Sequence, residues 1–202
     1  MSVPDRPADP MAAAASPHVS AWNVANALTA VRIVLVPLFG WLLLAGDGRA
    51  AWRWAAAAAF VLAVATDRFD GEVARRWQLI TDVGKIADPI ADKALIGTAL
   101  VCLSLMHELS WWATLVVLVR EVAVTALRFV VIRRVVLPAG RGGKAKTALQ
   151  SVAITLYLVP LAARWHPVAA AVMVAAVVLT VVSGLDYVVS IVRVMRRVEP
   201  AS

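Results

Sequence analysis

Six apolar segments, each near the length that a membrane-crossing helix requires, constrain the fold of this chain more than any other feature. A helix needs about 20 apolar residues to cross the hydrocarbon core of a bilayer. Hydrophobic residues make up 61% of the 202 residues and charged residues 16%, against roughly half and a quarter in soluble domains. The sequence therefore predicts an all-α integral membrane bundle of six transmembrane helices. We place them at residues 27–45, 52–76, 84–106, 111–134, 145–163 and 167–194.

The distribution of basic residues indicates the orientation of these helices. Lys and Arg gather after the second, fourth and sixth segments, and the opposite loops hold few. Because cytoplasmic loops carry an excess of Lys and Arg, we expect both termini in the cytoplasm and a multi-pass protein of the cell membrane. The net charge of +7 then indicates contact with anionic lipid headgroups and not with nucleic acid.

The ends of the chain and its tryptophans complete this picture. Residues 1–20 are rich in Pro, Ala and Ser, so we expect a flexible N-terminal tail without the features of a secretory signal. Residues 21–197 would then form one six-helix domain. Trp52, Trp54, Trp111, Trp112 and Trp165 lie near the predicted outer span ends, which is typical of an aromatic belt at a membrane interface.

Four aspartates lie where the second segment ends and the third begins. Asp67 and Asp70 are spaced i, i+3, and Asp88 and Asp92 are spaced i, i+4, so each pair shares one helix face. Carboxylates at the ends of membrane spans are costly unless they are paired, hydrated or bound to metal, and they indicate a functional site. Four converging carboxylates predict a site for divalent cations such as Mg²⁺ or Mn²⁺. Two such ions would clamp a transferring phosphoryl group.

Small and basic residues accompany the aspartates in the pattern D-x2-D-G-x2-A-R-x8-G-x3-D-x3-D. Gly71 would let a bulky group such as a nucleotide approach the backbone, and Ala74 keeps the same face small. Arg75 offers a fixed cationic fork for phosphate, and Gly84 allows helices to approach closely. Helix capping would not require these residues at these offsets. A membrane cation transporter, which also uses intramembrane carboxylates, is the alternative from another class.

The complete pattern resembles the signature of the CDP-alcohol phosphotransferase family, with all eight positions matched and the spacing intact. The resemblance implies a six-helix membrane fold, often dimeric, with its site at the cytoplasmic end and a CDP-linked lipid or alcohol as donor. It implies that Asp67, Asp70 and Asp88 are metal ligands, and that Asp92 is both a ligand of the second metal and the general base. The donor-binding residues that it implies in this stretch are Gly71, Ala74, Arg75, Thr81 and Gly84.

Asn26, Thr29 and Arg32 form one polar edge at the start of the first helix. Their spacing alone is equally compatible with a purely structural role at the start of the helix, with Asn26 as a cap and Arg32 reaching the membrane surface. The string NALTxxR resembles the phosphatidylglycerophosphate synthase branch of the family, although Ala25 stands where that branch often has Pro. The resemblance implies that these three residues bind CDP-diacylglycerol.

Basic residues of the fourth and fifth segments bear on the acceptor. The strings REVxVTxLR and GKxKTxxQ resemble the same branch, and a basic cluster facing the metal site would bind an anionic acceptor such as glycerol 3-phosphate. From spacing alone, the lysines equally satisfy the positive-inside preference. Glu121 must find a partner at its depth and could pair with a basic residue. The expected acceptor-phosphate ligands are Arg128, Lys144, Lys146 and Thr147.

The sixth segment contains SGxDY at residues 183–187, which again resembles this branch. We expect it to orient a basic side chain, with Arg128 as the candidate. The resemblance implies an enzyme that transfers the phosphatidyl group of CDP-diacylglycerol to sn-glycerol 3-phosphate, giving phosphatidylglycerol phosphate and CMP. Within the same family, the acceptor could instead be phosphatidylglycerol, as in a cardiolipin synthase, or inositol phosphate or serine.

Overall fold

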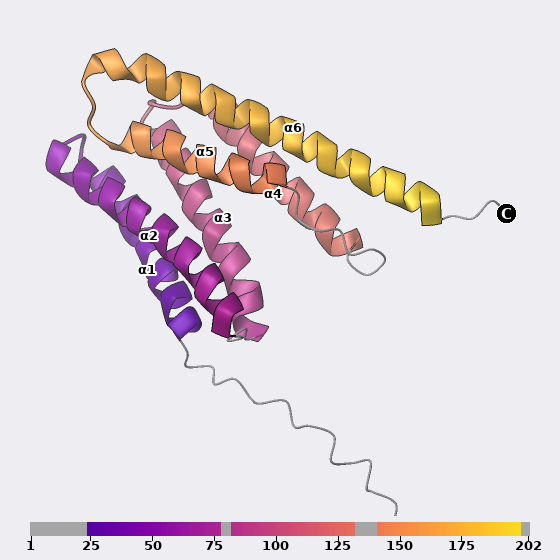
Figure 1. Ribbon diagram of the computed structural model, residues 1–202. Coiled ribbons are helices and arrows are strands. Elements are labelled where there is room, and N and C mark those ends of the chain that lie inside the picture. The colour runs from indigo at the N-terminus through magenta and orange to yellow at the C-terminus, as the bar shows by residue number, and fades with distance from the viewer. Residues whose placement is uncertain (1–23, 78–81, 132–140, 199–202) are drawn as a thin grey trace, which may run out of the picture.

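Six α-helices and a short 3₁₀ turn make up the computed structural model, which describes residues 24–77, 82–131 and 141–198 (Figure 1). These ranges contain no strand, so the expected all-α class is confirmed for them. Residues 1–20 lie outside them, and the expected tail stays a prediction. The elements are α1 (Val24–Ala45), α2 (Ala50–Trp77), α3 (Asp82–Leu105), α4 (Trp111–Val131), α5 (Arg141–Leu158), η1 (Ala163–Trp165) and α6 (His166–Val198).

Two helix ends show how glycine and proline set the boundaries. The turn between α1 and α2 contains Asp47 and Gly48, both with positive φ. A Cβ atom on Gly46 would lie 2.5 Å from the Cβ atom of Trp52, so this close turn requires glycine. Helix α5 ends at Leu158, earlier than the expected 163. Pro160 explains the difference, because proline disfavours the helical conformation at the residue before it and donates no backbone hydrogen bond.

Six helices are confirmed among the described residues, but not that all six cross a membrane. Within the described residues, one stretch, Ala163–Val194, is long and apolar enough to cross a membrane by length and composition. Thr29–Ala45 and Lys93–Leu105 are apolar but shorter. Charged side chains interrupt the other helices, for example Arg120 and Glu121 in the middle of α4. The six-span topology therefore stays a prediction.

The helices pack in two groups that meet along their length. Helix α1 packs on α2 and α3, while α6 packs on α4 and α5 (Figure 1). Contacts of α3 with α4 and α5, and of α2 with α5, join the groups. Large apolar side chains point away from the bundle on α1, α4 and α6, among them Val34, Val119 and Leu185, each more than 60% exposed. Extensive apolar surface of this kind marks a contact with lipid or with another protein.

The buried core lies toward one end of the bundle. The chain reverses direction from each helix to the next (Figure 1), so late α1, early α2 and late α3 lie together, as do early α4, late α5 and early α6. Many of the buried apolar residues among the described side chains fall in these parts, including Phe39, Phe60, Leu103, Val117, Ile154 and Met173. Exposed tryptophans lie at the same end, namely Trp41, Trp54, Trp111, Trp112 and Trp165. We call this the tryptophan end, and the end where α2 stops and α3 starts the acidic end.

Candidate functional site

An ion pair between α1 and α2 fixes the first aspartate of the acidic stretch. The Arg32 Nη1 atom lies 2.9 Å from Oδ1 of Asp67. The Arg32 side chain is fully buried, whereas that of Asp67 is 40% exposed. Thr29, one turn earlier on α1, is also buried. Arg32 therefore does not extend to the membrane surface, which was the structural alternative for this residue. It orients a carboxylate that still faces solvent.

Asp67 meets the chemical requirements of a metal ligand. An ionised carboxylate has about four lone-pair positions, so one contact with Arg32 leaves acceptor capacity for a cation. Residues that orient a ligand through a hydrogen bond tune metal sites in general. The described side chains contain no group of three or more His, Cys, Asp or Glu residues that could hold a metal ion. The residues present thus fit a divalent cation at Asp67, and the complete ligand set stays a prediction.

The backbone places the two aspartate pairs at matching levels. Asp67 lies ten residues before the last residue of α2, and Asp92 lies ten residues after the first residue of α3. At about 1.5 Å of rise per residue, both lie about 15 Å along their helices from the connecting turn. Asp70 and Asp88 lie closer to that turn and also correspond in level. Two successive, contacting helices therefore carry the four aspartates at common heights.

Several predicted residues of this region cannot be placed at the level of side chains. The side chains of Asp70, Asp88 and Asp92 lie outside the described part of the structure, as do those of Asn26 and Arg75. The same holds for the predicted small residues Gly71, Ala74 and Gly84, and Thr81 lies outside the described residues altogether. A close helix approach of the kind expected at Gly84 does occur at Gly40 of α1. A Cβ atom there would lie 3.1 Å from Thr98 of α3.

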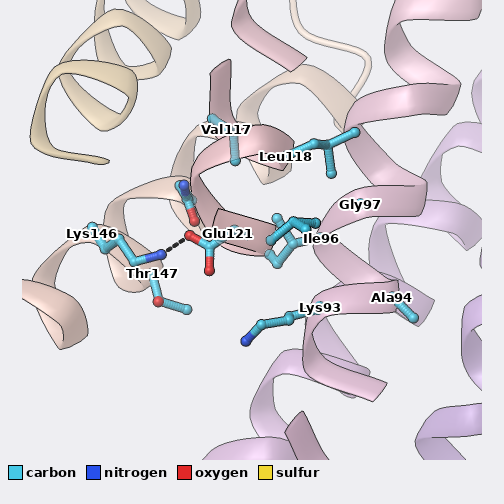
Figure 2. A pocket seen from close by; sticks show the side chains of 11 residues that line it. Lys93, Ala94, Ile96, Gly97, Val117, Leu118, Glu121, Lys146 and Thr147 are labelled. Atoms are coloured by element: carbon cyan, nitrogen blue, oxygen red, sulfur yellow. Dashed lines mark hydrogen bonds and ion pairs between the residues drawn. The ribbon is translucent and has the colours of Figure 1, made fainter. Parts of the chain in front are cut away.

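A cavity of about 220 Å³ lies between α3, α4 and α5. Its polar lining comprises Lys93, Glu121, Lys146, Thr147 and Gln150, and its apolar lining includes Ile96, Val117 and Leu118 (Figure 2). Two of the four predicted acceptor ligands, Lys146 and Thr147, therefore line one cavity. The side chains of the other two, Arg128 on α4 and Lys144 on α5, lie outside the described part of the structure.

Glu121 is the centre of a charged network beside this cavity. Its Oε1 atom accepts a hydrogen bond from Lys146 Nζ of α5 and another, at 3.1 Å, from Nη1 of the neighbouring Arg120 (Figure 2 shows the Lys146 bond). The side chains of Glu121 and Arg120 are 19% and 13% exposed, and that of Lys146 is 7% exposed. The expected pairing of Glu121 with a basic residue is confirmed, with two partners.

Helix α6 holds the other side of Arg120. The guanidinium donates from Nε to the Thr180 carbonyl at 3.1 Å and from Nη2 to Ser183 Oγ at 3.0 Å. A Cβ atom on Gly184 would lie only 3.0 Å from Arg120 Nε, so glycine makes room for the guanidinium. Gln150 of α5 donates to Thr180 Oγ1 at 2.8 Å. The SGxDY string thus orients a basic side chain, as expected, but among the described residues that side chain is Arg120.

Sequence reasoning missed Lys93 and the roles of Arg120 and Thr180. A signal for Lys93 was available: it follows Asp92 directly and opens an apolar run, where a cation must find partners. A similar signal exists for Arg120, which lies in the middle of an apolar helix. No pattern marks Thr180 as the shared partner of α4 and α5, because its role depends on how α6 packs across both.

Comparisons with known proteins identify the family of this chain. Residues 22–182 match the family model for CDP-alcohol phosphatidyltransferase. A probable phosphatidylglycerophosphate synthase of Mycobacterium tuberculosis is 50% identical over 172 residues, which cover 85% of this chain and 82% of that protein. A CDP-diacylglycerol–glycerol-3-phosphate 3-phosphatidyltransferase of Bacillus subtilis is 36% identical over 180 residues, covering 82% and 93% of the two chains. A protein of that name from Rickettsia typhi is 38% identical over 137 residues, covering 67% and 76%. The chain belongs to the CDP-alcohol phosphatidyltransferase family.

Proposed function

We propose that this chain is a CDP-diacylglycerol–glycerol-3-phosphate 3-phosphatidyltransferase of phospholipid biosynthesis. The observation that carries the proposal is a combination within one chain. The aspartate signature of the family lies on α2 and α3, and a cavity lined by Lys146 and Thr147 opens between α3, α4 and α5. Ammonium and hydroxyl donors suit a phosphate-bearing acceptor better than an uncharged one. The similarity to named enzymes over most of both chains supports the same activity.

The reaction would exchange one phosphoester oxygen for another. The acceptor hydroxyl oxygen forms a bond to the phosphorus on the diacylglycerol side of CDP-diacylglycerol, and the bond from that phosphorus to the CMP oxygen breaks. Asp92 takes the proton of the attacking hydroxyl. Asn26, Thr29, Arg32, Gly71, Ala74, Arg75, Thr81 and Gly84 would hold the donor, and Arg128, Lys144, Lys146 and Thr147 the acceptor phosphate. Catalysis then consists mainly of positioning and charge neutralisation.

Divalent cations belong to this proposal. Asp67, Asp70, Asp88 and Asp92 would hold two Mg²⁺ or Mn²⁺ ions, which supply neutralisation of the pyrophosphate and acidification of the attacking hydroxyl. The ion pair with Arg32 fixes the Asp67 carboxylate, which would hold an ion, and neutralises part of its charge. This partial neutralisation limits repulsion among the four carboxylates at the acidic end.

The membrane arrangement of the enzyme follows the charge pattern and the exposed surface. All six helices of a domain over residues 21–197 would cross the cell membrane, with both termini and the acidic end on the cytoplasmic side. The exposed tryptophans at the other end support placing that end at a membrane interface, where tryptophan is favoured. The exposed apolar faces of α1, α4 and α6 offer contact with lipid and a surface for a homodimer.

Release of CMP by the purified protein tests the proposal. The protein in detergent with CDP-diacylglycerol and Mg²⁺ or Mn²⁺ is offered glycerol 3-phosphate, inositol phosphate, serine or phosphatidylglycerol. The proposal predicts CMP release and phosphatidylglycerol phosphate with glycerol 3-phosphate above all others. Preference for an uncharged acceptor would refute the assignment of the basic residues. Metal flux into liposomes without any dependence on nucleotide would favour a transporter instead.

A further inference from the structure

The cavity between the two helix groups receives cations from both of them. Lys146 and Thr147 enter from α5, and Lys93 enters from α3, the helix that carries Asp88 and Asp92 (Figure 2). The acceptor ligands expected from the sequence all lie on α4 and α5. Lys93 therefore adds a positive charge from the opposite side of the cavity, on the helix that holds the proposed base.

Among the described side chains, two of the three charged residues that line the cavity are cations. Its charged lining consists of Lys93, Lys146 and Glu121. Glu121 is bonded to Lys146 and also to Arg120, whose guanidinium is held by α6. The Glu121 carboxylate is therefore held by Arg120 of α4 and Lys146 of α5, and these two cations offset its charge. Figure 2 shows Lys93 extending from α3, across from Lys146 and Thr147 of α5.

The size and position of the cavity match a small acceptor. A volume of about 220 Å³ is below the roughly 300–1,000 Å³ of pockets for drug-sized ligands, so a compact molecule suits it better than a nucleotide with lipid chains. Lys93 directly follows Asp92 in α3. A cation in the cavity wall would hold one end of a short acceptor and so restrict its orientation.

We propose that Lys93 binds the phosphate of the acceptor, together with Lys146 and Thr147, and so sets the distance between that phosphate and the hydroxyl that reacts. This inference rests on the proposed function and extends it across the cavity. Both helix groups then contribute to one anion site, and the acceptor bridges them. Lys93 is in this view a specificity-determining residue, since an acceptor without an anionic group gains nothing from it.

Steady-state kinetics of Lys93→Gln and Lys93→Arg test this inference. Loss of one charge-assisted hydrogen bond predicts that Lys93→Gln raises KM for glycerol 3-phosphate about 10- to 100-fold. We expect kcat to change less than about threefold and KM for CDP-diacylglycerol to stay the same, because the lost contact binds ground state and transition state alike. Lys93→Arg keeps the charge and should recover most of the affinity. Arg193→Gln, which removes a charge from an exposed position on α6, is the matched control and should behave as wild type.

The outcomes separate this inference from the proposed function. If the wild type releases no CMP with glycerol 3-phosphate, the proposed function itself fails. If the wild type is active and Lys93→Gln leaves KM for glycerol 3-phosphate unchanged, only the role of Lys93 is refuted. An increase confined to KM for CDP-diacylglycerol would assign Lys93 to the donor and overturn the inference. If Lys93→Gln does not fold, the kinetics of Lys93→Arg decide. The inference is refuted if this variant folds and its KM rises for the donor and not for the acceptor.

Discussion

Two charged clusters, one at the tryptophan end and one nearer the acidic end, use similar residues for different purposes. At the tryptophan end, Arg53 of α2 forms two hydrogen bonds with Glu108 and also donates to the carbonyls of Tyr157 and Leu158 at the end of α5. Its donors satisfy terminal carbonyls of that helix, which is a stabilising arrangement for a cation. This cluster lines no cavity described here and joins three parts of the fold.

The cluster around Glu121 differs because one side of it is open. Arg120 and Lys146 satisfy the carboxylate, yet Glu121 and Lys146 also face the cavity of about 220 Å³. The first cluster therefore connects helices, and the second both connects helices and presents charge to a ligand. The comparison teaches that the location of a charge pair relative to the core and to a cavity decides its role, and four substitutions test this.

Replacement of Asp92 by Asn should have the largest effect. Loss of the general base and of a metal ligand is expected to lower the rate of CMP release about 10²- to 10⁴-fold, with no change in the midpoint of thermal unfolding. The control is Asp47→Asn at the tryptophan end, where Asn tolerates the positive φ of 46°. Equal rates for Asp92→Asn and wild type would remove the assignment of the base.

Glu121→Gln should affect both stability and acceptor binding. Breaking a buried ion pair leaves Lys146 without its carboxylate and costs about 3 kcal/mol in the free energy of unfolding. We also expect a changed KM for glycerol 3-phosphate, because Lys146 is no longer held at the cavity wall. Thermal unfolding in detergent and acceptor kinetics provide the two measurements. A stability loss with unaltered acceptor kinetics would make this cluster equivalent to that of Arg53.

Arg32→Lys tests whether the ion pair at Asp67 supports a metal site. Residues that orient ligands typically change metal affinity about 10- to 100-fold when mutated, so the Mg²⁺ or Mn²⁺ concentration for half-maximal activity should rise by that factor. Arg193→Lys makes the same exchange at an exposed position and should leave it unchanged. A rise in KM for CDP-diacylglycerol at constant metal requirement would instead favour the donor-binding role expected of Arg32.

Arg53→Met should have the smallest effect, confined to stability. The ion pair with Glu108 is partly exposed, at 13% and 31% for the two side chains, so we expect a loss of about 1–2 kcal/mol in the free energy of unfolding. Neither kcat nor KM should change in protein that remains folded. Altered acceptor affinity in this variant would show that the two clusters are coupled and would contradict the comparison.

The sequence predicted those features that depend on local residue patterns. Apolar segments and the glycine and proline breaks indicated six helices, and an intramembrane carboxylate indicated a partner for Glu121. It also predicted that Lys146 and Thr147 serve the acceptor, and the two do line one cavity.

Contacts between distant segments were not predictable in this way. Arg120 lies next to Glu121 in the sequence, but its hydrogen bonds to α6 depend on how α4 crosses that helix. Likewise, the donation of Arg53 to carbonyls more than 100 residues away follows from where α5 ends. Helix periodicity defines faces within one element, and only packing decides which faces meet.

The contact of Arg120 with Gly184 and Ser183 gives α6 an influence beyond its own surface. Within the described residues, α6 contains most of the one stretch that is long and apolar enough to cross a membrane. Any sliding of α6 relative to α4 displaces the guanidinium and, through Glu121, the ammonium of Lys146. The position of this ammonium at the cavity wall therefore depends on the register of α6 against α4.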